Sequence, residues 1–276
     1  FPTRRSSDLF NFSYMFQYND INIYEKGNRA YNTTYKYHLA EFGFSDVWYK
    51  NFRFGLGLRF EYYKYKDFLF KQPELIDLKV ESEHFLSYFA QIHYNTYDKG
   101  YFPAKGSDFK AAYSLYTDNM AQYNEHAPFS ALSASWASVL PITRRFSVIP
   151  SIYGRILIGR NFPYPLQNAI GGEVPGFYIP QQLPFAGVNN IELMDNAIMI
   201  ASLKLRQRMG AIHYLILTGN YGLTDSHFFK ILKGKQLFGI SAGYGMDSVF
   251  GPLEISLGYS NQTDKASCFV NLGYYF

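Results

Sequence analysis

The chain has 276 residues, a mass of 31.9 kDa and a formal net charge of +4. Its lysines and arginines are scattered, which argues against a nucleic-acid partner. Aromatic residues make up 20% of the chain and charged residues 17%, yet the mean hydropathy is −0.19 and no apolar run approaches the ~18 residues of a transmembrane helix. This composition is typical of strands with one apolar and one polar face, as in a membrane barrel.

The chain opens with FPTRRSSDL, residues 1–9, which looks like the translation of a sequencing adaptor. We therefore expect residues 1–9 to be an artefact leader and residues 10–276 to be an outer-membrane β-barrel that lacks its N-terminal part. In that case the absence of a signal peptide says nothing about the compartment.

Alternating hydrophobicity predicts about twelve strands along the chain. In the third of them, Leu56 shares one face with Phe52 and Phe60, whereas Arg59 and Glu61 lie on the other. The expected strands are residues 10–24, 30–44, 51–66, 83–97, 107–118, 129–140, 145–160, 193–208, 211–222, 236–247, 252–262 and 267–276.

The predicted connections alternate in length. Residues 141–144, 208–211 and 248–251 are short, with 98–106 a longer turn on the same side, whereas 67–82, 119–128, 161–192 and 223–235 are long. Outer-membrane barrels have short periplasmic turns and long extracellular loops. We predict an all-β fold, a transmembrane antiparallel up-and-down barrel. The alternative is a soluble β-sandwich that ends on an edge strand, although such edges are usually blunted by charge.

The last predicted strand carries an apolar face up to the final residue. Cys268, Val270, Leu272, Tyr274 and Phe276 share this face, on which the single cysteine acts as a small hydrophobic residue. A C-terminal aromatic strand of this kind resembles the signal that the barrel assembly machinery reads, so we assign Leu272, Tyr274 and Phe276 to that signal.

Three stretches carry a family resemblance: NAIGGEVPGFYIPQQLPFAGV (residues 168–188), GPLEISLGYSN (251–261) and FVNLGYYF (269–276). They resemble the C-terminal barrel of bacterial patatin-like phospholipases, within the surface-antigen superfamily of outer-membrane assembly and secretion barrels. DKGYFPAKGSDFKAAYSLYTDN (98–119) looks like the superfamily's short turn of Asp, aromatic, Pro and Gly before an upward strand. The resemblance implies a barrel of roughly sixteen strands, an even number as in other bacterial barrels. It further implies that about four strands, a POTRA-type module and the hydrolase are missing upstream.

The resemblance also implies that the long loop before the fifth strand from the end folds into the lumen. The residues assigned to it are Gly171, Gly172, Gly176, Phe177 and Tyr178. Many superfamily members carry an Arg-Gly-aromatic tip on this loop, and this sequence has no such arginine. That departure argues against borrowing their assembly or translocation mechanism.

Two features of the sequence resemble catalytic motifs of lipases, but neither fits the chemistry that the motif requires. GISAG (239–243) matches G-x-S-x-G, but Ser241 lies inside a clean strand alternation with no helix after it. None of the six histidines is followed two residues later by serine, the spacing of the outer-membrane phospholipase A family. The carboxylates of Glu61 and Glu254 are expected to pair with lumenal Arg53, Arg59, Lys204 or Arg206. We assign no catalytic, cofactor-binding or metal-binding residue to this fragment, although the full-length protein could be a lipid acyl hydrolase.

We therefore expect a barrel domain in the outer membrane of a Gram-negative bacterium that anchors a patatin-like phospholipase missing from this chain, with translocation of that hydrolase left open. The alternative is a stand-alone porin or small-molecule transporter. The expected partners are outer-membrane lipid, the barrel assembly machinery and the covalently linked upstream hydrolase.

Overall fold

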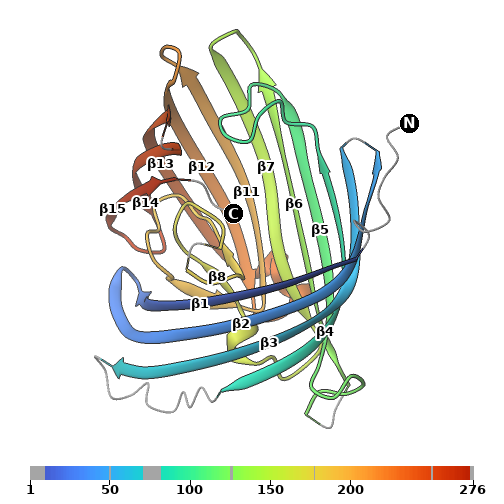
Figure 1. Cartoon of the computed structure of the whole chain (residues 1–276). Coiled ribbons are helices and arrows are strands. Elements are labelled where there is room, and N and C mark those ends of the chain that lie inside the picture. Colours follow the sequence, from blue (N-terminus) through green and yellow to red (C-terminus); the bar gives the residue numbers. More distant parts are fainter. Residues whose placement is uncertain are drawn as a thin grey trace.

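A single curved sheet of twelve strands forms the wall of the molecule (Figure 1). The computed structural model describes residues 10–49, 51–70, 82–124, 127–176, 178–249 and 251–273. No helix in these ranges is both long and apolar enough to cross a membrane. The wall strands are β1 (Phe10–Glu25), β2 (Asn28–Tyr49), β3 (Phe52–Phe70), β4 (Glu83–Asn95), β5 (Gly106–Thr117), β6 (Phe129–Pro141), β7 (Phe146–Ile158), β11 (Ala197–Arg208), β12 (His213–Asp225), β13 (Lys235–Ser248), β14 (Gly251–Ser260) and β15 (Ala266–Leu272).

Each wall strand pairs antiparallel with its neighbour in the chain, except that β7 pairs with β11 across a long inserted loop. The predicted count of twelve strands and the up-and-down order are confirmed. The expected strand at 193–208 begins later, because residues 193–195 form β10 of a separate small sheet. β2 and β3 have 22 and 19 residues, about twice the 9–11 that cross a bilayer, so both extend beyond the membrane.

The two faces of the wall differ as the alternation predicts. Leu56 and Leu257 lie on the outer face with 45% and 65% of their surface exposed, whereas Glu61 and Ser241 are buried on the lumenal face. An apolar side chain on the outer face of a membrane barrel meets lipid rather than water. The exposed leucines, isoleucines and aromatics of the outer face are therefore solvated by acyl chains.

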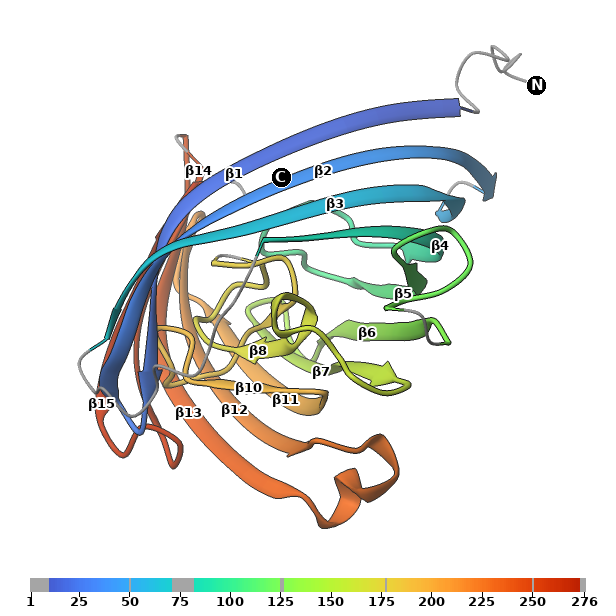
Figure 2. The same cartoon turned by 90° about the horizontal axis from the view of Figure 1, so that it is seen from below.

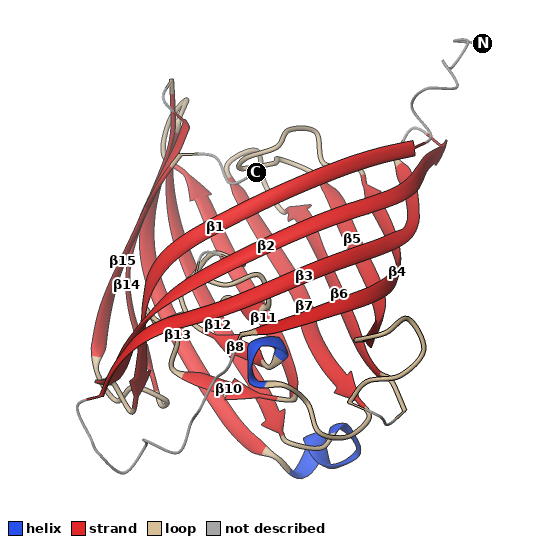
Figure 3. Ribbon diagram, turned by 60° about the horizontal axis from the view of Figure 1, so that its bottom comes forward, coloured by secondary structure: helices blue, strands red, loops and turns tan. Residues whose placement is uncertain are grey.

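The aromatic core of the protein lies inside the lumen, at the end that carries the long loops. Tyr116 stacks on Phe129 with ring centroids 5.2 Å apart, and Phe85 meets Tyr116 edge to face at 6.2 Å. Leu166 of the inserted loop belongs to the same buried cluster. Figure 3 shows the inserted loop inside the curve of the strands, where its side chains fill part of the lumen.

β1 and β15 are the two edges of the sheet, and the described residues show no strand pairing between them. Their long-loop ends nevertheless approach each other (Figure 2). The Lys265 ammonium, between β14 and β15, donates to the Gly27 carbonyl at 2.9 Å and to Asn28 Oδ1 at 2.7 Å. The two edges are thus linked at one rim through side chains.

Candidate functional site: the lumen and its inward-folded segments

The loop between β7 and β11, which we call the lumenal loop, occupies the lumen at the long-loop end (Figure 2). It contains the 3-10 turn η3 (Tyr164–Leu166) and a three-stranded sheet in the order β10-β8-β9, built from β8 (Asn168–Ile170), β9 (Gln182–Leu183) and β10 (Leu193–Asp195). This small sheet satisfies part of the loop's own backbone, which a buried irregular loop would otherwise leave unpaired.

A half-buried cation on the wall holds the first half of the lumenal loop. Arg155 of β7 donates to the Leu166 carbonyl at 2.7 Å and also to Asn168 Oδ1. Asn168 Nδ2 in turn donates to the carbonyls of Arg155 and Asn196, both at 2.8 Å. The arginine that binds the acceptors of this part of the loop therefore lies on the wall.

The second half of the loop is bound to β7 and β12. Tyr153 donates to the Pro184 carbonyl at 2.8 Å, and the Ala186 amide donates to Asn220 Oδ1 of β12 at 2.9 Å. Gly187 has a φ of +78°, and a Cβ there would lie 2.3 Å from the Tyr259 backbone. Only glycine lets the loop approach the wall this closely.

The predicted loop residues that the structure describes lie in the lumenal loop, between β8 and β9. Gly171 is buried against the Asn190 backbone, while Gly172 and Gly176 have positive φ values of +64° and +69°. Tyr178 donates from its hydroxyl to the Asn189 carbonyl at 2.8 Å. Phe177 lies outside the described residues.

Below the lumenal loop is a cavity of about 1100 Å³ that reaches the short-turn end of β3, β4 and β5. Its lining is polar and mixed in charge, with Arg53, Arg59, Glu61, His93, Asp108, Lys110 and Arg155 among serine and alanine side chains. Four of these side chains are cationic and two are anionic, so the lining carries both signs with an excess of positive charge.

The expected pairing of Glu61 with an arginine is not what the lumen shows. Glu61 accepts hydrogen bonds from the hydroxyls of Tyr63 at 2.6 Å and Tyr37 at 3.3 Å, while Arg59 forms its ion pair with Glu41 at 2.7 Å. A second pair, which was not predicted from the sequence, joins His93 Nε2 to Asp108 Oδ1 at 2.6 Å. It could have been predicted, because the alternation places both side chains on the lumenal face near the facing ends of β4 and β5.

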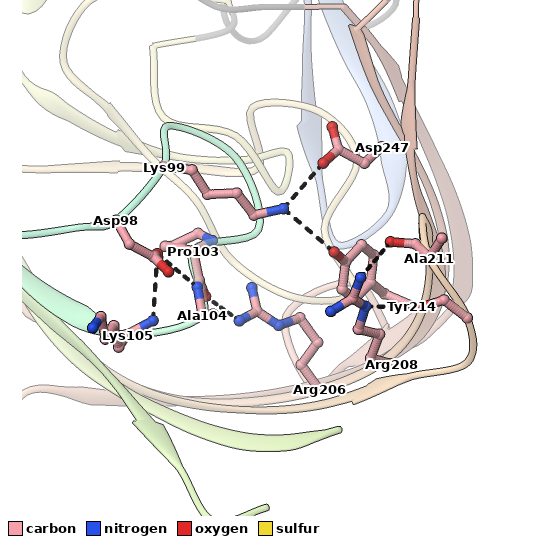
Figure 4. A network of polar contacts seen from close by, with 11 residues as sticks. Asp98, Lys99, Pro103, Ala104, Lys105, Arg206, Arg208, Ala211, Tyr214 and Asp247 are labelled. Carbon is pink, nitrogen blue, oxygen red and sulfur yellow. Dashed lines mark hydrogen bonds and ion pairs between the residues drawn. The ribbon is translucent and has the colours of Figure 1, made fainter. Parts of the chain in front are cut away.

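The longer turn on the short-turn side also folds inward, across the mouth of the lumen (Figure 4). Phe102, with a positive φ of 44°, stacks on Tyr214 of β12 with ring centroids 4.4 Å apart. Lys99 pairs with Asp247 of β13 at 3.1 Å, and Arg206 of β11 donates to the Pro103 carbonyl. A stretch expected as a simple connection therefore links two distant parts of the wall.

Ser241 lies in the middle of β13, which continues to Ser248, and its side chain is buried on the lumenal face. It is therefore not on the strand-to-helix turn that a nucleophile elbow requires. Among the described residues, no cluster of three or more His, Cys, Asp or Glu side chains could hold a metal ion. Of the proposed assembly signal, Leu272 faces outward and is exposed, whereas Tyr274 and Phe276 lie outside the described residues.

Glu192 connects the lumenal loop to the β1–β2 turn. Its Oε2 accepts a hydrogen bond from the Gly27 amide at 3.2 Å. Burial raises the pKa of this carboxyl, and the Gly27 hydrogen bond and the charges of Lys265 and Lys235 only partly offset that rise. The ionised form is thus less favourable here than in water.

The sequence profile of the OMP85 superfamily matches residues 5–276. A comparison with curated proteins finds no match. Among solved structures, the chain is similar to the crystal structure of BamA from Haemophilus ducreyi lacking POTRA domains 1-3, with a TM-score of 0.71 and 13% identity over 97% of this chain and 59% of that one. It is also similar to CdiB from Escherichia coli, with a TM-score of 0.63 and 14% identity over 95% of this chain and 49% of that one.

At these identities the likeness to BamA and CdiB shows the fold, and the chain spans less than two thirds of either protein. The superfamily match, at residues 5–276, covers all the wall strands and the lumenal loop. The curved antiparallel sheet, its apolar outer face and its loop-filled lumen agree with that match. The chain therefore belongs to the OMP85 superfamily and is an outer-membrane β-barrel protein.

Proposed function

We propose that this chain is the membrane-embedded part of a larger protein, and that it anchors an attached patatin-like phospholipase domain. Three observations support this. The stretches at 168–188 and 251–261 resemble the barrels of such phospholipases. The chain spans 59% of the crystallised BamA chain, which lacks POTRA domains 1-3, and 49% of the CdiB chain. In the part of the chain that the structure describes, the edges β1 and β15 are not paired with each other, and an open edge in lipid leaves backbone groups unsatisfied.

The position of the lumenal loop is the observation that best supports the anchoring role. It is hydrogen-bonded to β7 and β12 and buries an aromatic core, so the lumen is filled at its long-loop end. A filled lumen suits a protein that holds a domain at the membrane better than one that conducts solutes continuously. The cavity reaches the short-turn side, which is periplasmic in such barrels, and the attached domain would face it there.

A stand-alone porin or small-molecule transporter is the second candidate, favoured by the same cavity of about 1100 Å³ with its charged and hydroxyl-bearing lining. Conductance separates the two. In planar bilayers, the anchor should be electrically silent until the lumenal loop is cut out, whereas a porin should conduct steadily with its loop intact.

The natural protein gives the direct test of the anchor. An antibody against this barrel should precipitate from outer membranes a protein much larger than 31.9 kDa. That protein should carry phospholipase activity, which removal of its upstream part should abolish while the barrel stays in the membrane. A precipitated protein no larger than a barrel, without lipase activity, would refute the anchoring proposal.

The size of the complete barrel has its own test. Residues 10–276 alone should run at the same gel position whether boiled or not, whereas the full-length protein should show the heat-dependent shift of a closed barrel. A compact, heat-modifiable fragment would mean that twelve strands close by themselves.

A further inference from the structure

The loop between β12 and β13 folds over the outside of the wall. It contains the 3-10 turn η4 (Phe228–Lys233), whose Ile231 is buried against Ile156, Ala197, Met199 and Leu223. These four partners alternate along their strands with residues that contact the lumenal loop, such as Arg155 and Ile198, so they lie on the outer face. Figure 3 shows η4 at the edge of the molecule, away from the lumenal loop.

The remaining side chains of η4 are apolar and basic. Phe229 and Leu232 are 94% and 81% exposed, and Lys230 and Lys233 stand next to them in the sequence. Neither ammonium has an ion-pair partner among the residues that the structure describes. Apolar side chains beside lysines, held on the outer wall at the long-loop rim, match the boundary between acyl chains and headgroups.

Directly below η4, toward the middle of the membrane, the outer wall has an apolar groove of about 530 Å³. The groove is deep because its two central outward-facing residues, Ala201 and Gly219, have little or no side chain. No atom lies within 4 Å of the position that a Cβ of Gly219 would take. Aromatic and aliphatic side chains wall the groove: Leu203, Tyr221, Phe238 and Tyr259. Tyr221 and Phe238 are in ring contact at 5.1 Å.

The groove and η4 form one continuous surface. Met199 and Leu223, which η4 covers, stand two residues along β11 and β12 from Ala201 and Tyr221 of the groove. An acyl chain in the groove would therefore bring its headgroup to the level of the two lysines. Because this wall faces lipid, membrane lipid is the occupant present in greatest excess.

We propose that this surface is a binding site for a lipid of the outer leaflet whose phosphate headgroup carries a net negative charge, with an acyl chain in the groove and the phosphate at Lys230 and Lys233. The lysines supply charge complementarity, since each basic residue near an anionic membrane surface adds about 1 kcal/mol, or about fivefold, to the binding. The groove supplies the shape that distinguishes one bound lipid from a loose annulus.

The test uses a tryptophan in the groove and lipids that quench it. Tyr221→Trp keeps the aromatic pair with Phe238, and Trp48→Phe and Trp136→Phe remove the two native tryptophans of this chain. The same protein with Tyr221 retained gives the background signal that is subtracted. The full-length protein is refolded into phosphatidylcholine vesicles that contain a minor fraction of either phosphatidylglycerol or phosphatidylcholine brominated on its acyl chains. Circular dichroism gives the folded fraction to which each signal is normalised.

Brominated phosphatidylglycerol should quench the reporter at a lower membrane fraction than brominated phosphatidylcholine. That preference should fall about fivefold for each of Lys230→Gln and Lys233→Gln, which remove one positive charge, whereas Lys26→Gln, at the exposed β1–β2 turn, should leave it intact. Gly219→Leu should fill the groove and reduce quenching by both lipids, with Gly219→Ala giving a smaller effect. Ala90→Leu, on the outer face of β4, is the matched control.

Equal quenching by the two lipids would overturn the assignment of the phosphate to the lysines. Unchanged quenching in Gly219→Leu would overturn the assignment of the acyl chain to the groove.

Discussion

Replacing Leu257 by arginine should destabilise the protein in a bilayer by about 2–4 kcal/mol, a roughly 30- to 1000-fold change in the folding equilibrium. Leu257 is in the middle of β14, is 65% exposed on the outer face, and lies opposite Ala242 of β13 and Cys268 of β15. None of these neighbours offers a carboxylate. A guanidinium there would lose its water without gaining a partner, which is the source of the cost.

The measurement is a guanidinium titration of the protein folded into phosphatidylcholine vesicles. The control is Ser151→Arg, because Ser151 lines the lumenal cavity and lies opposite Ala137 and Ser202. Gly57 is lumenal by the alternation but is a poor control, since a Cβ there would be 2.3 Å from the Phe42 carbonyl. Equal stabilities for Leu257→Arg and wild type, or equal losses for Leu257→Arg and Ser151→Arg, would refute the assignment of the two faces.

Three further predictions follow from the lumen and the chain end. If the full-length protein is a lipase, Ser241→Ala should leave its activity intact, and loss of esterase activity with a folded barrel would show that the rejected motif matters. Because burial raises the pKa of Glu192, the contribution of this carboxyl to docking of the lumenal loop should be fully present below the ordinary carboxyl pKa and should fall as pH rises through the raised value. The rate of limited proteolysis of the loop should therefore depend on pH in the wild type and depend less on pH in Glu192→Gln. An identical pH profile for the two proteins would contradict this prediction. Deleting Phe276 from the full-length protein should lower its yield in the outer membrane while sparing a soluble upstream domain, and an unchanged yield would remove Phe276 from the assembly signal.

The strands were predictable because lipid and lumen impose a period of two on every wall segment, and the chain obeys it from β1 to β15. Some lumenal pairs were within reach as well. Arg59 lies directly opposite Glu41, a register that agrees with the short connection between the end of β2 at Tyr49 and the start of β3 at Phe52. An arginine was expected to pair with Glu61 because both residue types lie on the lumenal face. That expectation did not take into account which residues of β2 and β3 lie opposite each other.

The inward-folded segments could not be predicted in detail, because their contacts join residues far apart in the sequence. Phe102 reaches Tyr214 only through a positive φ that the residue type does not announce. β10 has three residues and exists only because β8 lies beside it, so its short apolar run was extended into the next wall strand. The η4 turn was missed for a related reason, since its one buried residue packs on the outside of three separate strands.

The lumenal loop also connects the filling of the lumen to the two edges of the sheet. Asn189 Nδ2 donates to the Cys268 carbonyl of β15 at 2.6 Å, and the Tyr24 amide of β1 donates to the Ile191 carbonyl at 2.7 Å. Residues two apart in one loop thus hold opposite edges of the wall. Withdrawing this part of the loop from the lumen would break both contacts, because the same short segment makes them. Emptying the lumen and separating the edges at this rim are therefore coupled, and Lys265 would be left as the side chain that still links them.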